Sequence, residues 1–243
     1  MQALHVYTFA PAWGLPSAGP FALKLLAWLS LHGVPHRQVI ENRPGRGPEG
    51  KSPWIERGGR RMGDSDRIIA DLAARHGLPG APAPGRPAAA HGLALRALFE
   101  QEVHQVLEYE LFVHPGGRAF IDRAVAEDVP RPLAPLAAAG LRRHFRRQLH
   151  ARGIGRLAPG EVAARGARAL DALAALRGAD AAPFFGGERP DLTDLAVWGQ
   201  VAPLLHWPMP TPAAAHAKSL PAVATWAEAV RRACFGGADA RAA

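Results

Sequence analysis

The sequence predicts a small α/β domain followed by an all-helical domain. Short runs of β-branched and aromatic residues, which are typical of strands, occur near the start of the chain. A stretch rich in Pro, Gly and Ala, LPGAPAPGRP at residues 78–87, then separates them from segments whose apolar residues recur at helical spacing. We therefore expect an α/β domain over residues 1–78, a linker over residues 79–87 and an all-helical domain over residues 88–243.

The first domain is expected to begin with a strand, a helix and a parallel strand. Leu4–Phe9 has the composition of a strand, and Gly19-Pro20 opens a helix that ends before Gly33. The expected elements after this helix are a strand at His36–Glu41, a hairpin formed by Trp54–Arg57 and Arg60–Met62, and a helix at Ser65–His76. This order is typical of a thioredoxin-like unit with right-handed β-α-β topology.

The second domain is expected to be a bundle of helices. The expected helices are Ala88–Val113, Arg118–Ala126, Pro132–His150, Pro159–Arg177, Leu192–Leu205 and Ala222–Arg232. The start of the helix expected at Leu192–Leu205 is especially well marked, because Asp191 can cap this helix while Asp194 reaches back to a free amide.

Composition excludes several classes of protein. The 243 residues contain no run of about 18 uncharged apolar residues, so we expect no spanning helix. The first residues lack the pattern of a secretory signal, and we expect a cytoplasmic protein. The single cysteine, Cys234, cannot form an intramolecular disulfide or a cysteine-based zinc site. We expect no metal.

The net charge of +8 does not by itself indicate a nucleic-acid partner. Only three of the 29 basic residues are lysines, and Ala, Gly and Pro are abundant, which is typical of GC-rich coding. The densest basic segment is Arg142–Arg147, followed by Arg152 and Arg156, with Phe145 as its one aromatic residue. A solvated helix face or a rim for an anionic ligand is favoured over nucleic acid.

The segment Gly50–Glu56 is the most informative stretch. Pro53 directly precedes an expected strand, and with a cis peptide bond the N–H and C=O of Ser52 would be offered to a ligand. An extended peptide could then dock by strand-like pairing. The alternative is an ordinary loop with a trans proline.

Asp64 and Ser65 stand where a helix is expected to begin. The Ser65 hydroxyl and the free N–H groups of the first turn could hold a carboxylate, while Asp64 could pair with an ammonium group. One end of a zwitterion would fit this arrangement. Plain N-capping by either residue is the alternative.

These motifs resemble the glutathione transferase superfamily, and more narrowly its failed-axon-connections and metaxin-like branch. The segments that carry the resemblance are Pro16–Lys24, Gly50–Glu56, Asp64–Ser65, Ala151–Arg156 and Asp191–Asp194. It covers the chain from Leu4 to about Phe235, and Pro-Trp-Ile-Glu and Gly-Ile-Gly-Arg are the segments specific to the branch. The resemblance implies the glutathione transferase (GST) fold.

The resemblance also implies glutathione as co-substrate. Lys51, Ser52 and Pro53 would contact its cysteinyl-glycine part, and Asp64 and Ser65 would hold its γ-glutamyl end. The sulfur would then lie near the start of the first helix, beside Gly19 and Phe21.

The sequence departs from the family at the position that should activate the sulfur. The family usually has Ser or Cys directly before Pro-Phe, and Gly19 occupies this position here. The amides of Phe21 and Ala22, with the helix dipole, could lower the thiol pKa. Alternatively Ser17 or Tyr7 could act as the catalytic hydroxyl, although Tyr7 also fits as a packed strand residue.

Two functions therefore remain open at this point. The first is a glutathione transferase-like enzyme that acts on an apolar electrophile. The second is a non-catalytic, metaxin-like binding or scaffold protein, and a basic adaptor for membrane or RNA is a third, weaker interpretation. We allow for a homodimer and for peripheral membrane contact, the latter not favoured.

A further cluster has the spacing of a ligand stripe. Glu100, His104 and Glu108 follow one another at intervals of four residues on an expected helix. Metal ligation would need further ligands of this kind, and a polar stripe facing solvent or a ligand is the favoured interpretation.

Overall fold

The computed structural model describes residues 3–81, 85, 87–178 and 181–236. Its N-terminal part contains a four-stranded sheet in the order β2-β1-β3-β4. The strands are β1 (His5–Thr8), β2 (Arg37–Ile40), β3 (Trp54–Arg57) and β4 (Arg60–Gly63). β1 pairs with β2 in parallel and with β3 in antiparallel orientation, and β3 pairs antiparallel with β4. The predicted strands are all present.

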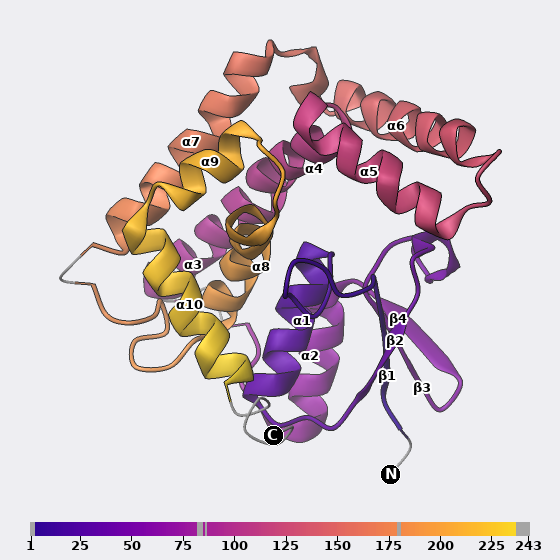
Figure 1. Cartoon of the computed structure of the whole chain (residues 1–243). Coiled ribbons are helices and arrows are strands. Elements are labelled where there is room, and N and C mark those ends of the chain that lie inside the picture. The colour runs from indigo at the N-terminus through magenta and orange to yellow at the C-terminus, as the bar shows by residue number, and fades with distance from the viewer. Residues whose placement is uncertain (1–2, 82–84, 86, 179–180, 237–243) are drawn as a thin grey trace.

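Two helices lie on the same side of this sheet, α1 (Pro20–Leu31) and α2 (Ser65–His76) (Figure 1). The alternation along the strands explains this arrangement. Val6 and Ile55 point into the hydrophobic core that also holds Leu23 of α1 and Ile68 of α2. α2 has the predicted bounds, with Gly77 in a left-handed conformation directly after it.

The remainder of the described chain is helical, as predicted. The α-helices are α3 (Pro87–Ala97), α4 (His104–Phe112), α5 (Pro115–Asp128), α6 (Ala134–Ala151), α7 (Pro159–Leu176), α8 (Leu192–His206), α9 (Pro212–Lys218) and α10 (Pro221–Phe235). Short 3-10 turns, η1 (Pro44–Arg46) and η3 (Ile154–Arg156), and a π-helical segment, η2 (Leu98–Val103), complete the set. No helix in the described residues is both long and apolar enough to cross a membrane.

Three elements differ from the sequence-based expectation. The helix expected over residues 88–113 is interrupted by η2, whose wider turns shift the register of the side chains after it. α5 begins at Pro115 instead of Arg118, because His114 caps it by accepting the Gly116 amide hydrogen at 3.1 Å. α9 was not predicted. Residues 82–84 and 86 of the predicted linker lie outside the described residues, as do residues 237–243.

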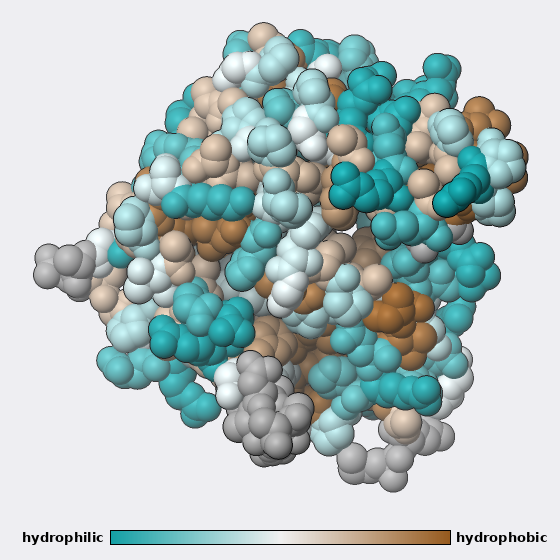
Figure 2. All heavy atoms as spheres, in the orientation of Figure 1, coloured by the Kyte–Doolittle hydropathy of each residue, from teal (hydrophilic) through white to brown (hydrophobic). Residues whose placement is uncertain are grey.

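The hydrophobic core runs through both parts of the chain. One cluster of buried residues contains Leu23 and Ile68 of the sheet-containing part together with Val103 and Trp198 of the helical part. α8 approaches α1 closely at Gly199, where an added Cβ would lie 2.5 Å from the Pro20 carbonyl oxygen. The start of α1 is therefore held against the helical part. Figure 2 shows that hydrophilic residues cover much of the outer face, with apolar patches between them.

Candidate functional site

Three segments of the chain leave the sheet at the same edge. Trp54 is the first residue of β3, and it pairs with Tyr7 near the end of β1 and with Gly63 at the end of β4. Because both ladders are antiparallel, the residues before Trp54 lie beside those that follow β1 and β4. The loop into β3, the start of α2 and the loop from β1 to α1 are thus brought together.

The peptide bond between Ser52 and Pro53 is cis. This is the conformation that the ligand-binding interpretation of the segment required. Pro53 is buried, and Lys51 is exposed. The Ser52 hydroxyl oxygen is buried, and it has no hydrogen-bond partner among the described residues. A buried hydroxyl without a partner is costly, so it is a natural point of contact for a ligand.

Asp64 caps α2. Its Oδ1 accepts the amide hydrogens of Asp66 and Arg67 at 3.0 and 3.1 Å, which is the N-capping that the sequence left as an alternative. The backbone of Asp64 has a positive φ of 68°, with ψ at 116°. Ser65, the first residue of the helix, is 4% exposed.

The start of α1 offers backbone donors but no side-chain hydroxyl at Gly19. Gly19 is the N-cap residue, and Pro20 opens the first turn. In an α-helix the first N–H groups have no acceptor within the helix, so the amides of Phe21 and Ala22 are free to meet an anion. An added Cβ on Gly19 would lie 2.9 Å from the Phe9 ring, which leaves little room for a larger residue.

The hydroxyl of Ser17 is occupied by the backbone around it. Ser17 is fully buried, its Oγ donates to the Phe9 carbonyl oxygen at 3.0 Å, and it accepts the amide hydrogen of Gly19 at 3.2 Å. These contacts favour a structural role for Ser17.

The ring of Tyr7 is packed on the sheet. It stacks on Trp54 with the ring centroids 4.7 Å apart and the planes at 5°. Its strand neighbours Val6 and Thr8 are fully buried, and Val6 belongs to the core that faces α1. By the alternation of a strand, Tyr7 points to the face opposite α1. Tyr7 therefore lies as a packed strand residue, which is the alternative to a catalytic hydroxyl that the sequence left open.

A buried ion cluster beside Ser65 was missed in the sequence. Lys24 of α1 is 1% exposed, and its Nζ contacts Asp66 Oδ1 at 3.0 Å and Glu100 Oε1 at 2.6 Å. Arg96 approaches the same Asp66 oxygen at 3.9 Å. The cluster joins α1, α2 and the π-helical segment. In the sequence, Lys24 was only a charge within an apolar run, and no local pattern indicates its partners.

The stripe of Glu100, His104 and Glu108 is divided by the π-helical segment. Glu100 turns to Lys24, whereas His104 Nε2 lies 3.6 Å from Glu108 Oε1, and Glu108 also pairs with Arg152. The pKa of Glu108 is lowered: burial opposes the shift, but the contacts with His104 and Arg152 outweigh it. Within the described residues, no group of three or more such side chains could hold a metal ion.

His104 also reaches the start of α1. Its ring centroid lies 4.8 Å from that of Phe21, and its Nδ1 is 3.1 Å from Gln200 Oε1 on α8. A side chain of α4 therefore contacts the first turn of α1.

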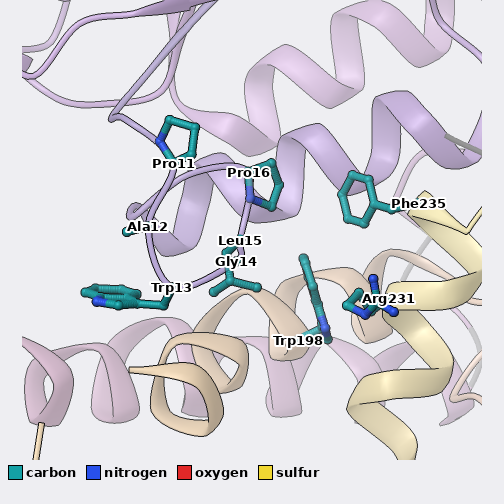
Figure 3. A pocket seen from close by; sticks show the side chains of 9 residues that line it. All are labelled: Pro11, Ala12, Trp13, Gly14, Leu15, Pro16, Trp198, Arg231 and Phe235. Carbon is teal, nitrogen blue, oxygen red and sulfur yellow. The ribbon is translucent and has the colours of Figure 1, made fainter. Parts of the chain in front are cut away.

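The loop between β1 and α1 carries a cluster of aromatic rings. The Trp13 ring lies 5.4 Å from Phe120 of α5 and 5.9 Å from Trp207 at the end of α8. The indole N–H groups of Trp13 and Trp207 are buried and have no acceptor among the described residues. Trp13 has a positive φ of 54°, which is unusual for a bulky residue. The same loop forms one wall of a cavity of about 500 Å³, with Trp198, Arg231 and Phe235 opposite it (Figure 3).

Comparison with known proteins agrees with this architecture. Residues 20–117 match the family model described as glutathione S-transferase N-terminal domain. An isoprene-epoxide–glutathione S-transferase from Rhodococcus sp. (strain AD45) is 24% identical over 94% of this chain and 98% of its own length. The failed axon connections protein of Drosophila melanogaster is 33% identical over 73 residues, which are 30% of this chain and 18% of that protein.

Solved structures show the same fold. The β-etherase LigF from Sphingobium sp. strain SYK-6 has a TM-score of 0.66 at 14% identity, covering 98% of this chain and 99% of its own. Glutathione S-transferase III in its apo form has a TM-score of 0.57 at 17% identity, covering 98% and 96%. The chain has the glutathione transferase fold, a thioredoxin-like domain with a helical domain. The family model covers residues 20–117, and the structures show that the likeness in fold extends over both parts of the chain.

Proposed function

We propose that this protein is a glutathione transferase-like enzyme that binds glutathione and conjugates, or otherwise transforms, an apolar electrophile. One observation carries the proposal: Ser52–Pro53, Asp64–Ser65 and the start of α1 meet at one sheet edge, where the Ser52 hydroxyl is buried without a partner among the described residues. The family match over residues 20–117 supports the choice of glutathione.

Glutathione would lie along this edge in an extended conformation. Lys51, Ser52 and Pro53 would contact the cysteinyl-glycine part, where the tripeptide can pair with the backbone as an added strand. The hydroxyl and the backbone amide of Ser65 would hold the γ-glutamyl carboxylate, because the amides of Asp66 and Arg67 already donate to Asp64. Asp64 uses Oδ1 for capping, and its other oxygen would meet the ammonium group.

The sulfur would be activated by the backbone at the start of α1. The amides of Phe21 and Ala22 and the positive end of the helix dipole stabilise a thiolate, which lowers the thiol pKa. Gly19 supplies no hydroxyl, and the contacts of Ser17 and Tyr7 described above leave neither as the preferred donor. Catalysis would then depend on ionisation of the thiol and on proximity of the electrophile.

We place the electrophile beside the aromatic cluster of Trp13, Phe120 and Trp207. The rings provide an apolar surface, and the buried N–H groups of Trp13 and Trp207 could donate to an oxygen of the substrate. The Rhodococcus relative is named for an epoxide, an electrophile with such an oxygen. A small apolar epoxide is therefore the first substrate to assay.

A non-catalytic binding or scaffold function is the second candidate. It is favoured by Gly19, which stands where the superfamily pattern has a hydroxyl or thiol. The partial match to failed axon connections supports a place in the failed-axon-connections and metaxin-like branch, which we retain as a proposal together with the domain boundaries near residues 78 and 88. We also propose a cytoplasmic location and a homodimer.

Calorimetric titration with glutathione tests the binding site. Ser65→Ala should weaken binding by about 1–3 kcal/mol, because it removes a charge-assisted hydrogen bond. Ser30→Ala is the matched control, since the Ser30 hydroxyl donates to the Cys234 carbonyl oxygen at 2.5 Å on another side of α1. An unchanged affinity in folded Ser65→Ala, or no binding by the wild-type protein at millimolar glutathione, would contradict the site.

Thiolate absorbance in the ultraviolet separates enzyme from scaffold. With glutathione bound, we expect the thiol pKa to fall below about 8.5, the value of a free thiol. Turnover of a model epoxide should follow the thiolate fraction as pH rises. Saturable binding without any shift and without turnover would instead support the scaffold.

A further inference from the structure

A basic groove runs between α5 and α6, and none of its residues belongs to the site described above. Its volume is about 820 Å³. The basic side chains that line it are Arg118, Arg142, Arg143, Arg146, Arg147 and His150. Arg118 comes from α5. The others follow one another on α6 at intervals of one or three residues, so that they form one stripe along that helix.

The positive charge of this groove is poorly balanced by the protein. Arg142 pairs with Asp122, and its side chain is only 15% exposed. No carboxylate among the described residues forms an ion pair with the other arginines of the groove, which are Arg118, Arg143, Arg146 and Arg147. Burial and the nearby charges of Arg118 and Arg146 lower the pKa of Arg142. Like charges that converge in this way repel one another, and a bound anion would relieve the repulsion.

The one aromatic residue within the basic segment is not free to stack on a nucleic-acid base. The Phe145 ring stacks on Phe112 of α4, with the centroids 3.6 Å apart and the planes at 3°. Proteins that bind single strands rely on exposed rings between basic residues. This groove therefore lacks the exposed aromatic rings that a single-strand binding site needs.

We propose that the groove between α5 and α6 binds an anion that carries two or more phosphate groups. Guanidinium groups suit phosphate, because their planar donors can form paired hydrogen bonds with its oxygens. The stripe from Arg142 to His150 extends about 12 Å along α6, which is long enough for several phosphates. The site does not depend on the binding of glutathione.

Two sources could supply such an anion, a free polyphosphorylated metabolite or the headgroup of an anionic lipid. Leu133 and Leu136 lie at the turn into α6 and are 55% and 74% exposed. Figure 2 shows apolar spheres at this right-hand end of the helix pair. Exposed leucines beside a basic stripe are typical of a helix that rests on a bilayer surface, whereas a free metabolite would not need them.

Titration calorimetry with tripolyphosphate tests the groove. We expect saturable binding that weakens as ionic strength rises. The double variant R143Q/R146Q should lower the affinity at least about tenfold, since it removes two contacts to phosphate. The matched control R37Q/R60Q makes the same change of net charge with exposed arginines of β2 and β4, and it should change the affinity less than about twofold.

Vesicles distinguish the two sources. Co-sedimentation with phosphatidylcholine vesicles, with and without cardiolipin, whose headgroup carries two phosphates, is compared for the wild type and for L133S/L136S. Binding that needs cardiolipin and is lost in L133S/L136S, while tripolyphosphate binding stays, assigns the groove to a lipid. Tripolyphosphate binding without vesicle binding assigns it to a free anion. The proposal is overturned if neither probe binds, or if R37Q/R60Q weakens binding as much as R143Q/R146Q.

Discussion

Ser17 Oγ accepts the amide hydrogen of Gly19 at 3.2 Å, directly before the first turn of α1. The same hydroxyl donates to the Phe9 carbonyl oxygen, so one buried side chain fixes the loop that leads into the helix. A hydroxyl held in this way is poorly placed to serve a bound thiol. It stabilises the position of the helix start, whose amides we assign to the thiolate.

Ser17→Ala should therefore lower the stability of the protein without changing the pKa of the bound glutathione thiol. Because the buried Gly19 amide loses its acceptor and the Phe9 carbonyl oxygen keeps only the Thr8 hydroxyl as donor, the free energy of unfolding should fall by about 1–3 kcal/mol. Urea denaturation measures this loss, and thiolate absorbance with glutathione bound should give the wild-type pKa. Tyr7→Phe, which keeps the stacked ring, is the control and should retain the pKa as well. Loss of the pKa shift in either variant would assign activation to that hydroxyl.

Gly19→Ser should increase the conjugation rate but reduce stability. The new hydroxyl would stand at the helix start, where it could donate to the sulfur. Its Cβ would lie 2.9 Å from the Phe9 ring, so the ring must shift, and we expect a loss of about 1–3 kcal/mol. Gly19→Ala has the same crowding without the hydroxyl. Equal turnover of a model epoxide by both variants would show that a hydroxyl at this position is not used.

Asp194→Ala should be among the most destabilising single changes in the chain. Asp194 is fully buried and accepts hydrogen bonds from the amides of Phe185, Gly186 and Asp191 and from the indole N–H of Trp226. Loss of these contacts should lower the free energy of unfolding by about 3 kcal/mol or more. Glutathione affinity per folded molecule should stay unchanged. Asp171→Ala, at an exposed position on α7, should cost less than about 1 kcal/mol.

Glu110 should make stability fall as pH rises in the acid range. Its side chain is nearly fully buried, and burial raises its pKa although the Ala213 amide donates to Oε1 at 2.6 Å. The folded protein thus favours the neutral form. The free energy of unfolding is highest below the pKa of Glu in the unfolded chain, about 4.3, and falls until pH passes the raised pKa.

Glu110→Gln should remove this dependence, because the amide is neutral at every pH and keeps an acceptor for Ala213. Urea denaturation over a pH series gives the difference between the wild type and the variant, which should decline with pH and then become constant. Glu127→Gln, at an exposed position on α5, is the control. A difference that rises with pH would show that the carboxylate is stabilised in its ionised form.

The elements that the sequence predicted well are those with local signals. Asp64 and Gly77 mark the two ends of α2, and the structure has that helix at the predicted residues. Asp191 and Asp194 form the predicted capping box. These signals act within a few residues, so no tertiary information is needed to recognise them.

The parts that escaped prediction depend on contacts between distant segments. The π-helical segment places Glu100 against Lys24 and so breaks the regular spacing with His104. The close approach of α5 to α4 requires Gly117, where an added Cβ would lie 2.0 Å from the Glu110 carbonyl oxygen. Spacing along the chain could group candidate residues, but it could not tell which of them share a partner.

The buried ammonium group of Lys24 links the two parts of the chain to each other. Its two carboxylate partners lie on either side of the predicted linker, Asp66 before it and Glu100 after it. Residues 1–78 expressed alone would retain the lysine but lose Glu100, and would expose the α1 surface that packs on Gly199. We therefore expect the two parts to unfold in one cooperative transition. Exchange of the N-terminal part between such proteins would succeed only where the recipient supplies a carboxylate at the position of Glu100.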